Sequence, residues 1–138
     1  MKVLLIEDNP DDVLAVERLA RASPAPVQLT EISDGASALE WLTFGGVQPD
    51  LILLDLALPG LPGGEVLRQL KAHSQLHDIP VIVVSGTQQD ADILEGVRLG
   101  AHSHIVKPIG QSDFAWIVAS VLRAQPRLSA LRGAQGKG

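Results

Sequence analysis

Three short segments of the chain are almost wholly apolar: Val3–Ile6, Leu51–Leu54 and Val81–Val84. Runs of this length and composition indicate strands that are buried on both faces, as in a parallel sheet covered by helices. Two further candidate strands, Val27–Ile32 and Ser103–Val106, carry more polar residues. We therefore expect these two strands at the edges of the sheet.

Segments with helical character fall between the candidate strands. The first helix is expected to begin at Asn9, which can cap it, with Pro10 at the first helical position. Asp11 and Asp12 follow, and we interpret them only as charges that favour the positive end of a helix. The other helices are expected near Gly35–Phe44, Pro62–Ala72, Gln88–Leu99 and Gln111–Arg123.

The last of these helices has the clearest pattern. Its apolar residues recur at the spacing that places them on one face of a helix, and they are Phe114, Ile117, Val118, Val121 and Leu122. Trp116 lies on the opposite side of the same helix, so we expect it to face solvent, a partner or the C-terminal tail.

The strict alternation of strand and helix predicts a doubly wound α/β fold with right-handed crossovers. We expect residues 1–124 to form one domain. The pattern stops after Arg123, and the remaining segment contains a proline and several glycines. Residues 125–138 are therefore expected to form a C-terminal arm or tail whose end is disordered.

Composition narrows the function classes. The chain has 138 residues, of which 46% are hydrophobic and 20% charged, as in soluble globular proteins. The net charge of −5 argues against nucleic acid as a partner, and the absence of cysteine excludes thiolate metal sites. No apolar run approaches the roughly 18 residues of a membrane span, and the start is too quickly acidic for a secretory signal. We expect a cytoplasmic protein that binds neither nucleic acid nor membrane.

Polar residues that carry chemistry follow four of the five candidate strands. Glu7 and Asp8 follow the first strand, Asp55 the third, Ser85 the fourth and Lys107 the fifth. In a doubly wound sheet, ligands bind beyond the carboxyl ends of the strands. We therefore expect these five side chains to converge on one rim.

This set of residues suits phosphoryl transfer onto a carboxylate. Asp55 can attack phosphorus, while Glu7, Asp8 and Asp55 supply the hard oxygen ligands that Mg²⁺ prefers. The metal and Lys107 would neutralise charge on the transferred group, and Ser85 would donate a hydrogen bond to it. Three carboxylates at close range repel one another without a cation, so the cluster itself implies a metal.

The sequence resembles the receiver domain of two-component response regulators. The segments that carry the resemblance are "VLLIEDNPDD", "DLILLDLALPGLPGGEVLRQLK", "IPVIVVSG" and "GAHSHIVKP", in that order, within about residues 1–124. The resemblance implies a flavodoxin-like five-stranded parallel sheet in the order 2-1-3-4-5. It also implies that Asp55 accepts a phosphoryl group from a sensor histidine kinase, and that the domain signals through protein contacts rather than as an enzyme.

The resemblance assigns finer roles at the rim. It implies that Asp8 binds Mg²⁺ directly and Glu7 through water, with the backbone carbonyl of Ala57 as a further ligand. Ser85 matches the switch hydroxyl of the family, and Lys107 matches the phosphate-binding lysine. The peptide bond between Lys107 and Pro108 resembles a cis bond of the family.

The chain resembles free-standing receivers, because no output domain is evident. The segment "IEDNPDDVLAVERLA" and the C-terminal arm are similar to regulators that are paired with phytochrome-type sensor kinases. A homodimer through the fourth helix, the fifth strand, the fifth helix and the arm is a further expectation, with Leu128 and Leu131 as candidate contacts.

Two positions depart from the family pattern. His104 stands where the family has an aromatic switch residue, and it is either a switch that swings inward or an ordinary side chain of an edge strand. Ala57 stands where many members carry a polar side chain beside the attacking water. Ala57 and Thr87 frame the approach of that water, so the lifetime of the phosphate stays open.

Three other functions fit these residues less well. An aspartyl-phosphate hydrolase commonly has a second Asp two residues after the nucleophile, and here that position is Ala57. A nucleotide- or flavin-binding module is disfavoured because the glycines of "PGLPGG" neither form the G-x-G-x-x-G pattern nor follow the first strand. A scaffold that cannot bind phosphate is disfavoured by the complete set of acids, hydroxyl and lysine.

Overall fold

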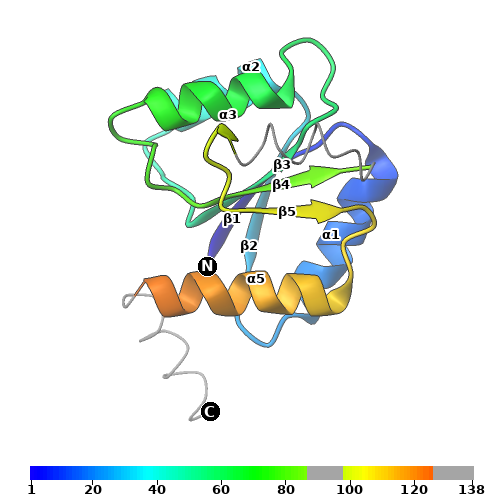
Figure 1. Ribbon diagram of the computed structural model, residues 1–138. Coiled ribbons are helices and arrows are strands. Elements are labelled where there is room, and N and C mark those ends of the chain that lie inside the picture. The colour runs from blue at the N-terminus through cyan, green and yellow to red at the C-terminus, as the bar shows by residue number, and fades with distance from the viewer. Residues whose placement is uncertain (87–97, 126–138) are drawn as a thin grey trace.

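Five parallel strands form one sheet in the order β2-β1-β3-β4-β5 (Figure 1). The structure is a computed structural model that describes residues 1–86 and 98–125. The strands are β1 (Lys2–Ile6), β2 (Gln28–Ile32), β3 (Leu51–Asp55), β4 (Val81–Ser85) and β5 (Ser103–Val106). The expected flavodoxin-like strand order is confirmed, and the two more polar strands, β2 and β5, do lie at the edges.

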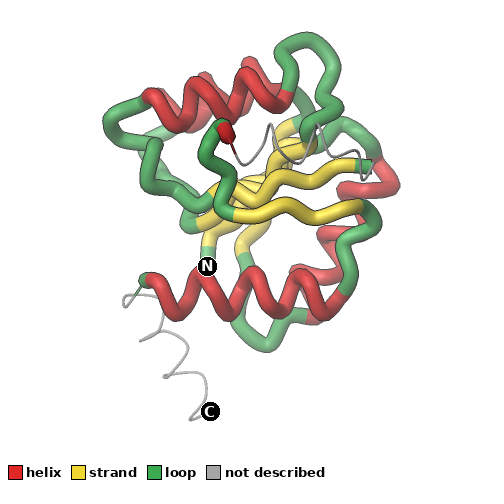
Figure 2. The backbone as a smooth tube through the Cα atoms, viewed as in Figure 1, coloured by secondary structure: helices red, strands yellow, loops and turns green. Residues whose placement is uncertain are grey.

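The strand register aligns the carboxyl ends of the central strands. Ile6 of β1 lies beside Leu54 of β3, and Asp55 lies beside Val84 of β4. Ser85, the last residue of β4, pairs with Val106 of β5. The residues that follow these strands are therefore delivered to the same rim, where loops connect the strands to the helices (Figure 2).

Among the described residues, two helices lie on each face of the sheet. Figure 1 shows α2 and α3 on one face and α1 and α5 on the other. Their bounds are α1 (Pro10–Ala22), α2 (Gly35–Phe44), α3 (Gly63–Ala72) and α5 (Gln111–Ala124). The helix expected near Gln88–Leu99 lies almost wholly outside the described residues, and so does the tail from residue 126 onward.

The alternation of side chains along each strand divides the core into two layers. Leu5 and Leu53 point to the layer beneath α1 and α5, which also contains Phe114. Leu4 and Leu54 point to the layer beneath α2 and α3. All four leucines are at most 3% exposed. Strands buried on both faces have no polar side to alternate with, which explains why β1, β3 and β4 read as continuous apolar runs.

The local signals at the helix ends act as expected. The side-chain oxygen of Asn9 accepts hydrogen bonds from the amides of Asp11 and Asp12, and Pro10 begins α1. On α5 the predicted apolar stripe is the buried face, whereas Trp116 is 51% exposed. In the described part of the chain, none of the helices has the length and apolar character needed to cross a membrane.

Candidate functional site

Three carboxylates meet at the carboxyl ends of β1 and β3. Glu7, Asp8 and Asp55 each offer one oxygen, and these oxygens lie within 4.8 Å of one another. Glu7 and Asp55 are buried, whereas Asp8 is exposed. The three acids that were expected at this rim thus lie close together, and the cluster has both buried and exposed members.

The two oxygens of Asp55 have different neighbours. The Oδ1 atom accepts a hydrogen bond of 3.0 Å from the amide of Ala57, whereas Oδ2 lies 3.5 Å from the Nζ atom of Lys107. The residue is only 3% exposed. The loop after β3 therefore fixes one oxygen and leaves the other turned toward the lysine.

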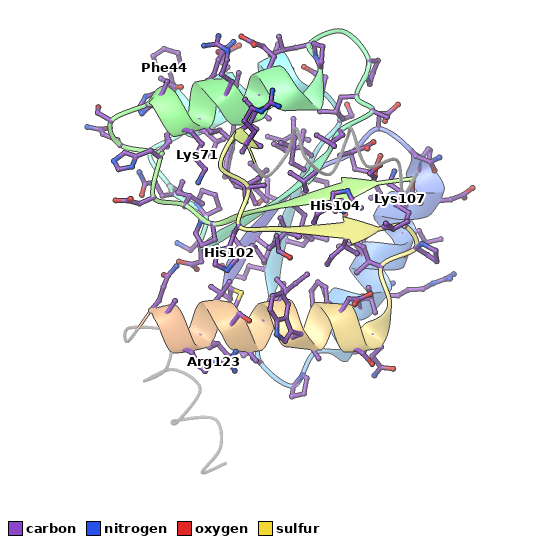
Figure 3. All side chains as sticks on the ribbon, in the orientation of Figure 1. Phe44, Lys71, His102, His104, Lys107 and Arg123 are labelled. Carbon is purple, nitrogen blue, oxygen red and sulfur yellow. The ribbon has the colours of Figure 1, made fainter. Side chains whose placement is uncertain are left out.

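The ammonium group of Lys107 lies among three carboxylates. Its Nζ atom is 2.7 Å from Asp12, 2.8 Å from Glu7 and 3.5 Å from Asp55. Figure 3 shows Lys107 at the end of the sheet where the arrows of β4 and β5 terminate. Burial disfavours the charged form, but the hydrogen bonds to Asp12 and Glu7 outweigh it, so the pKa of Lys107 is raised. The lysine is thus a permanent cation of this rim.

Glu7 is held at both oxygens. Its Oε1 atom meets Lys107, and its Oε2 atom accepts hydrogen bonds from the amides of Asp8 (3.1 Å) and Asn9 (3.2 Å). Burial and a hydrogen bond with Asp55 raise the pKa of Glu7 to about 7. This carboxyl therefore keeps a proton more readily than an ordinary glutamate does.

Ser85 and Lys107 are linked through the backbone. Ser85 is buried at the end of β4, and its carbonyl accepts a 2.7 Å hydrogen bond from the amide of Lys107. The Lys107–Pro108 peptide bond is cis, as expected. The backbone hydrogen bond therefore ties the residue that carries the hydroxyl to the residue that carries the ammonium.

Asp12 is a site residue that the sequence interpretation missed. It was expected only to place charge at the start of α1, and that expectation is wrong because its carboxylate forms an ion pair with Lys107. The two residues are 95 positions apart. The available signal was its place in the first turn of the helix that directly follows Asp8, at the same end of the sheet.

The remaining predicted residues lie around this centre. His104 is partly buried on β5, beside Val83, and its Nε2 atom is buried without a hydrogen-bond partner within the described residues. Figure 3 shows His104 on the strand that leads to Lys107. Trp116 lies on the exposed face of α5. Thr87 is outside the described residues.

A close backbone contact fixes the loop that carries Asp55. The amide of Gly63, at the start of α3, donates a 3.3 Å hydrogen bond to the carbonyl of Leu56. A Cβ atom at Gly63 would lie 2.4 Å from the carbonyl oxygen of Asp55 and 2.7 Å from the Cα atom of Leu56. The helix thus packs directly on the backbone behind the carboxylate, and only glycine leaves room for it.

Comparison with known proteins identifies a family. A model described as the response regulator receiver domain matches residues 3–119, inside the domain expected from the sequence. The chain is 36% identical over 123 residues to the transcriptional regulatory protein BaeR of Escherichia coli O6:H1, covering 88% of this chain and 48% of BaeR. This chain thus spans about half the length of several curated relatives that it matches.

Other relatives are matched over most of their length. The response regulator Rcp1 of Synechocystis is 30% identical over 124 residues, covering 86% of this chain and 84% of Rcp1. The crystal structure of the phosphorylated cyanobacterial phytochrome response regulator RcpA is similar with a TM-score of 0.76 and 32% identity, covering 88% and 90% of the two chains. The Mn²⁺-bound form of Rcp1 has a TM-score of 0.75 at 28% identity, covering 88% and 91%.

Proposed function

The chain belongs to the response regulator receiver domain family, and on that premise we propose that Asp55 accepts a phosphoryl group from a sensor histidine kinase. The observation that carries the proposal is the convergence of one buried aspartate, two further acids and one lysine. Asp55 lies within 4.8 Å of the oxygens of Glu7 and Asp8, and 3.5 Å from the ammonium of Lys107.

The two oxygens of Asp55 suggest how the transfer proceeds. Because Oδ1 is held by the amide of Ala57, Oδ2 is the oxygen placed to attack phosphorus. The new P–O bond forms as the P–N bond to the kinase histidine breaks, and the electron pair of that bond leaves with the imidazole. Lys107 then neutralises charge that develops on the phosphoryl oxygens, which is the main task of a protein in this reaction.

Mg²⁺ is the metal that we propose for the acidic cluster. The residues fit it, because three carboxylate oxygens within 4.8 Å of one another are hard ligands and the exposed side of Asp8 leaves room for bound water. Asp8, Asp55 and Glu7 would hold the ion, with the carbonyl of Ala57 as a proposed further ligand. When bound, the metal would supply positive charge to the phosphoryl oxygens.

Phosphorylation would act as a switch through Ser85 and Lys107. A phosphoryl group adds roughly −1.5 to −2 charges at neutral pH, so both residues would be drawn toward it. Their backbone hydrogen bond makes the ends of β4 and β5 respond together. The buried Nε2 atom of His104 has no hydrogen-bond partner in the described part of the chain, so a rearrangement that gave it one would be favourable.

We propose that the output is a protein contact on the face that includes α5. Trp116 is 51% exposed there, and a large exposed aromatic side chain favours a partner or a second copy of the chain. A homodimer through this face and the C-terminal arm stays a prediction, as does the cytoplasmic location. A phytochrome-type kinase as the donor is supported by the similarity to RcpA.

The test is phosphorylation of the purified protein by acetyl phosphate in the presence of Mg²⁺. Intact-mass measurement should show one added phosphoryl group in the wild type and none in the Asp55→Asn variant. The Asp11→Asn variant is a matched control, because it removes an exposed carboxylate near the rim. Modification of Asp55→Asn to the same extent as wild type would overturn the proposal, and steady turnover of a generic phosphate ester would favour a hydrolase.

A further inference from the structure

Lys107 is shared unequally among its three acidic neighbours. Its Nζ atom lies 2.7 Å from Asp12 and 2.8 Å from Glu7, but 3.5 Å from Asp55. An ammonium group has three protons to donate, and the two shorter distances are those of charge-assisted hydrogen bonds. Before phosphorylation, the lysine is therefore bound mainly by Asp12 and Glu7 rather than by the phosphoacceptor.

The two stronger partners differ in their freedom to move. Glu7 is buried, and its second oxygen is fixed by the amides of Asp8 and Asn9. The side chain of Asp12 is 31% exposed and comes from the first turn of α1. Glu7 is thus a partner of Lys107 that is held in place, whereas Asp12 is a more exposed partner that comes from α1.

We propose that Asp12 competes with the phosphoryl group on Asp55 for the ammonium group of Lys107, and so limits the stability of the phosphorylated state. Asp12 is a positioning residue, since it acts through the lysine and does not touch the reacting oxygen. The inference rests on the proposed phosphoryl transfer to Asp55, which it deepens by adding an anion that holds the lysine in the unphosphorylated form.

The physical reason is an exchange of partners. To reach the phosphoryl oxygens, the ammonium must weaken its ion pair with Asp12, and the free energy of that pair is subtracted from the gain at the phosphate. An asparagine at this position keeps a similar shape and a carbonyl acceptor, but its neutral hydrogen bond to the lysine is weaker. The Asp12→Asn variant should therefore release Lys107 to the phosphoryl group more easily.

The chain offers a matched control at the neighbouring position. Asp11 lies in the same first turn of α1 and carries the same charge, but it is exposed and forms no ion pair with Lys107 in the part of the chain that the structure describes. A general reduction of negative charge near the rim would act alike in Asp11→Asn and Asp12→Asn. Competition for the lysine would act only in Asp12→Asn.

The experiment is a titration with beryllofluoride, which mimics the phosphoryl group on a carboxylate, at fixed Mg²⁺ and followed by amide NMR shifts. We expect Asp12→Asn to bind beryllofluoride about three- to tenfold more tightly than wild type, the effect of one partly exposed ion pair. Asp11→Asn should stay within about twofold of wild type, as expected for an exposed charge. Equal or weaker binding by Asp12→Asn than by Asp11→Asn would overturn the proposal.

A double-mutant cycle tests whether the effect passes through the lysine. In a Lys107→Met background, the further change Asp12→Asn should leave the beryllofluoride affinity unchanged, because the shared cation is gone. The same gain in both backgrounds would overturn the competition and assign the effect to charge alone. If wild type shows no beryllofluoride binding at all, the proposed function fails as well, whereas binding by wild type without a gain in Asp12→Asn refutes only the role of Asp12.

Discussion

The contact between Gly63 and the backbone of Asp55 gives a sharp test of how the site is built. A Cβ atom at Gly63 would lie 2.4 Å from the carbonyl oxygen of Asp55, 2.7 Å from the Cα atom of Leu56 and 3.1 Å from the carbonyl carbon of Asp55. All three atoms belong to the backbone, so no side chain can rotate away. In Gly63→Ala, the start of α3 must move away from the end of β3.

The size of the effect follows from the distances. Ordinary contacts of a Cβ atom begin at 3.4 Å, so the shortest of these needs a displacement of about 1 Å. Overpacking of this kind costs about 1–3 kcal/mol, against which alanine gains at most about 1 kcal/mol of helix propensity over glycine. The net loss of unfolding free energy is therefore up to about 3 kcal/mol, so Gly63→Ala should lower the melting temperature by up to roughly 10 °C.

The matched control is the next residue. A Cβ atom at Gly64 would meet only the Cδ1 atom of Leu99 at 3.6 Å, an ordinary contact. Gly64→Ala should therefore be neutral or stabilising by up to about 1 kcal/mol, because alanine is the better helix former. Thermal unfolding by circular dichroism compares both variants with wild type. A Gly63→Ala protein as stable as Gly64→Ala would refute the claim that α3 packs on the backbone of Asp55.

Three further predictions concern the metal, the buried acid and the core. Mg²⁺ should raise the melting temperature of wild type and much less that of Asp8→Ala, and equal shifts in a thermal scan would contradict the assigned metal site. The pKa of Glu7 in the folded protein is about 7, above the ordinary 4.5, so the folded state binds this proton more tightly than the unfolded state does. The free energy of unfolding of metal-free wild type should therefore fall by up to about 3 kcal/mol as the pH rises from 4.5 to 7. In urea unfolding with chelator, Glu7→Gln should lack this loss, and parallel curves for the two proteins would contradict it. Ile117→Ala should lower the free energy of unfolding by about 2–5 kcal/mol and Trp116→Ala by under about 1 kcal/mol, because Ile117 is 1% exposed and Trp116 is 51% exposed. Similar losses for the two variants in urea unfolding would refute the assigned buried face of α5.

Much of the fold could be predicted because its signals are local. The apolar run Leu51–Leu54 is a strand buried on both faces, and its composition alone distinguishes it from the more polar edge strand β2. Asn9 and Pro10 mark the start of α1 because capping depends only on neighbours in the sequence. The acidic residues at the carboxyl ends of β1 and β3 meet because parallel strands deliver these ends to one edge of the sheet.

The missed part of the site depends on distances that no local pattern encodes. The charge of Asp12 has an adequate local explanation at the start of a helix, so nothing in the sequence required a second role. Its ion pair with Lys107 arises only when α1 packs on the sheet and β5, a strand of that sheet, brings Lys107 to the same end. The need for glycine at position 63 has the same origin, because the obstructing atoms belong to the backbone of another element.

The division of the core into two layers determines what the two tryptophans can report. Trp41 on α2 is packed against the layer beneath α2 and α3, whereas Trp116 lies on the solvent side of α5, which covers the other layer. The chain has no tyrosine, so these two indoles account for nearly all of its fluorescence. Trp116→Phe leaves an emitter that follows the α2–α3 side, and Trp41→Phe leaves one that follows the outer surface of α5. The protein thus contains a separate optical probe for each side of its sheet.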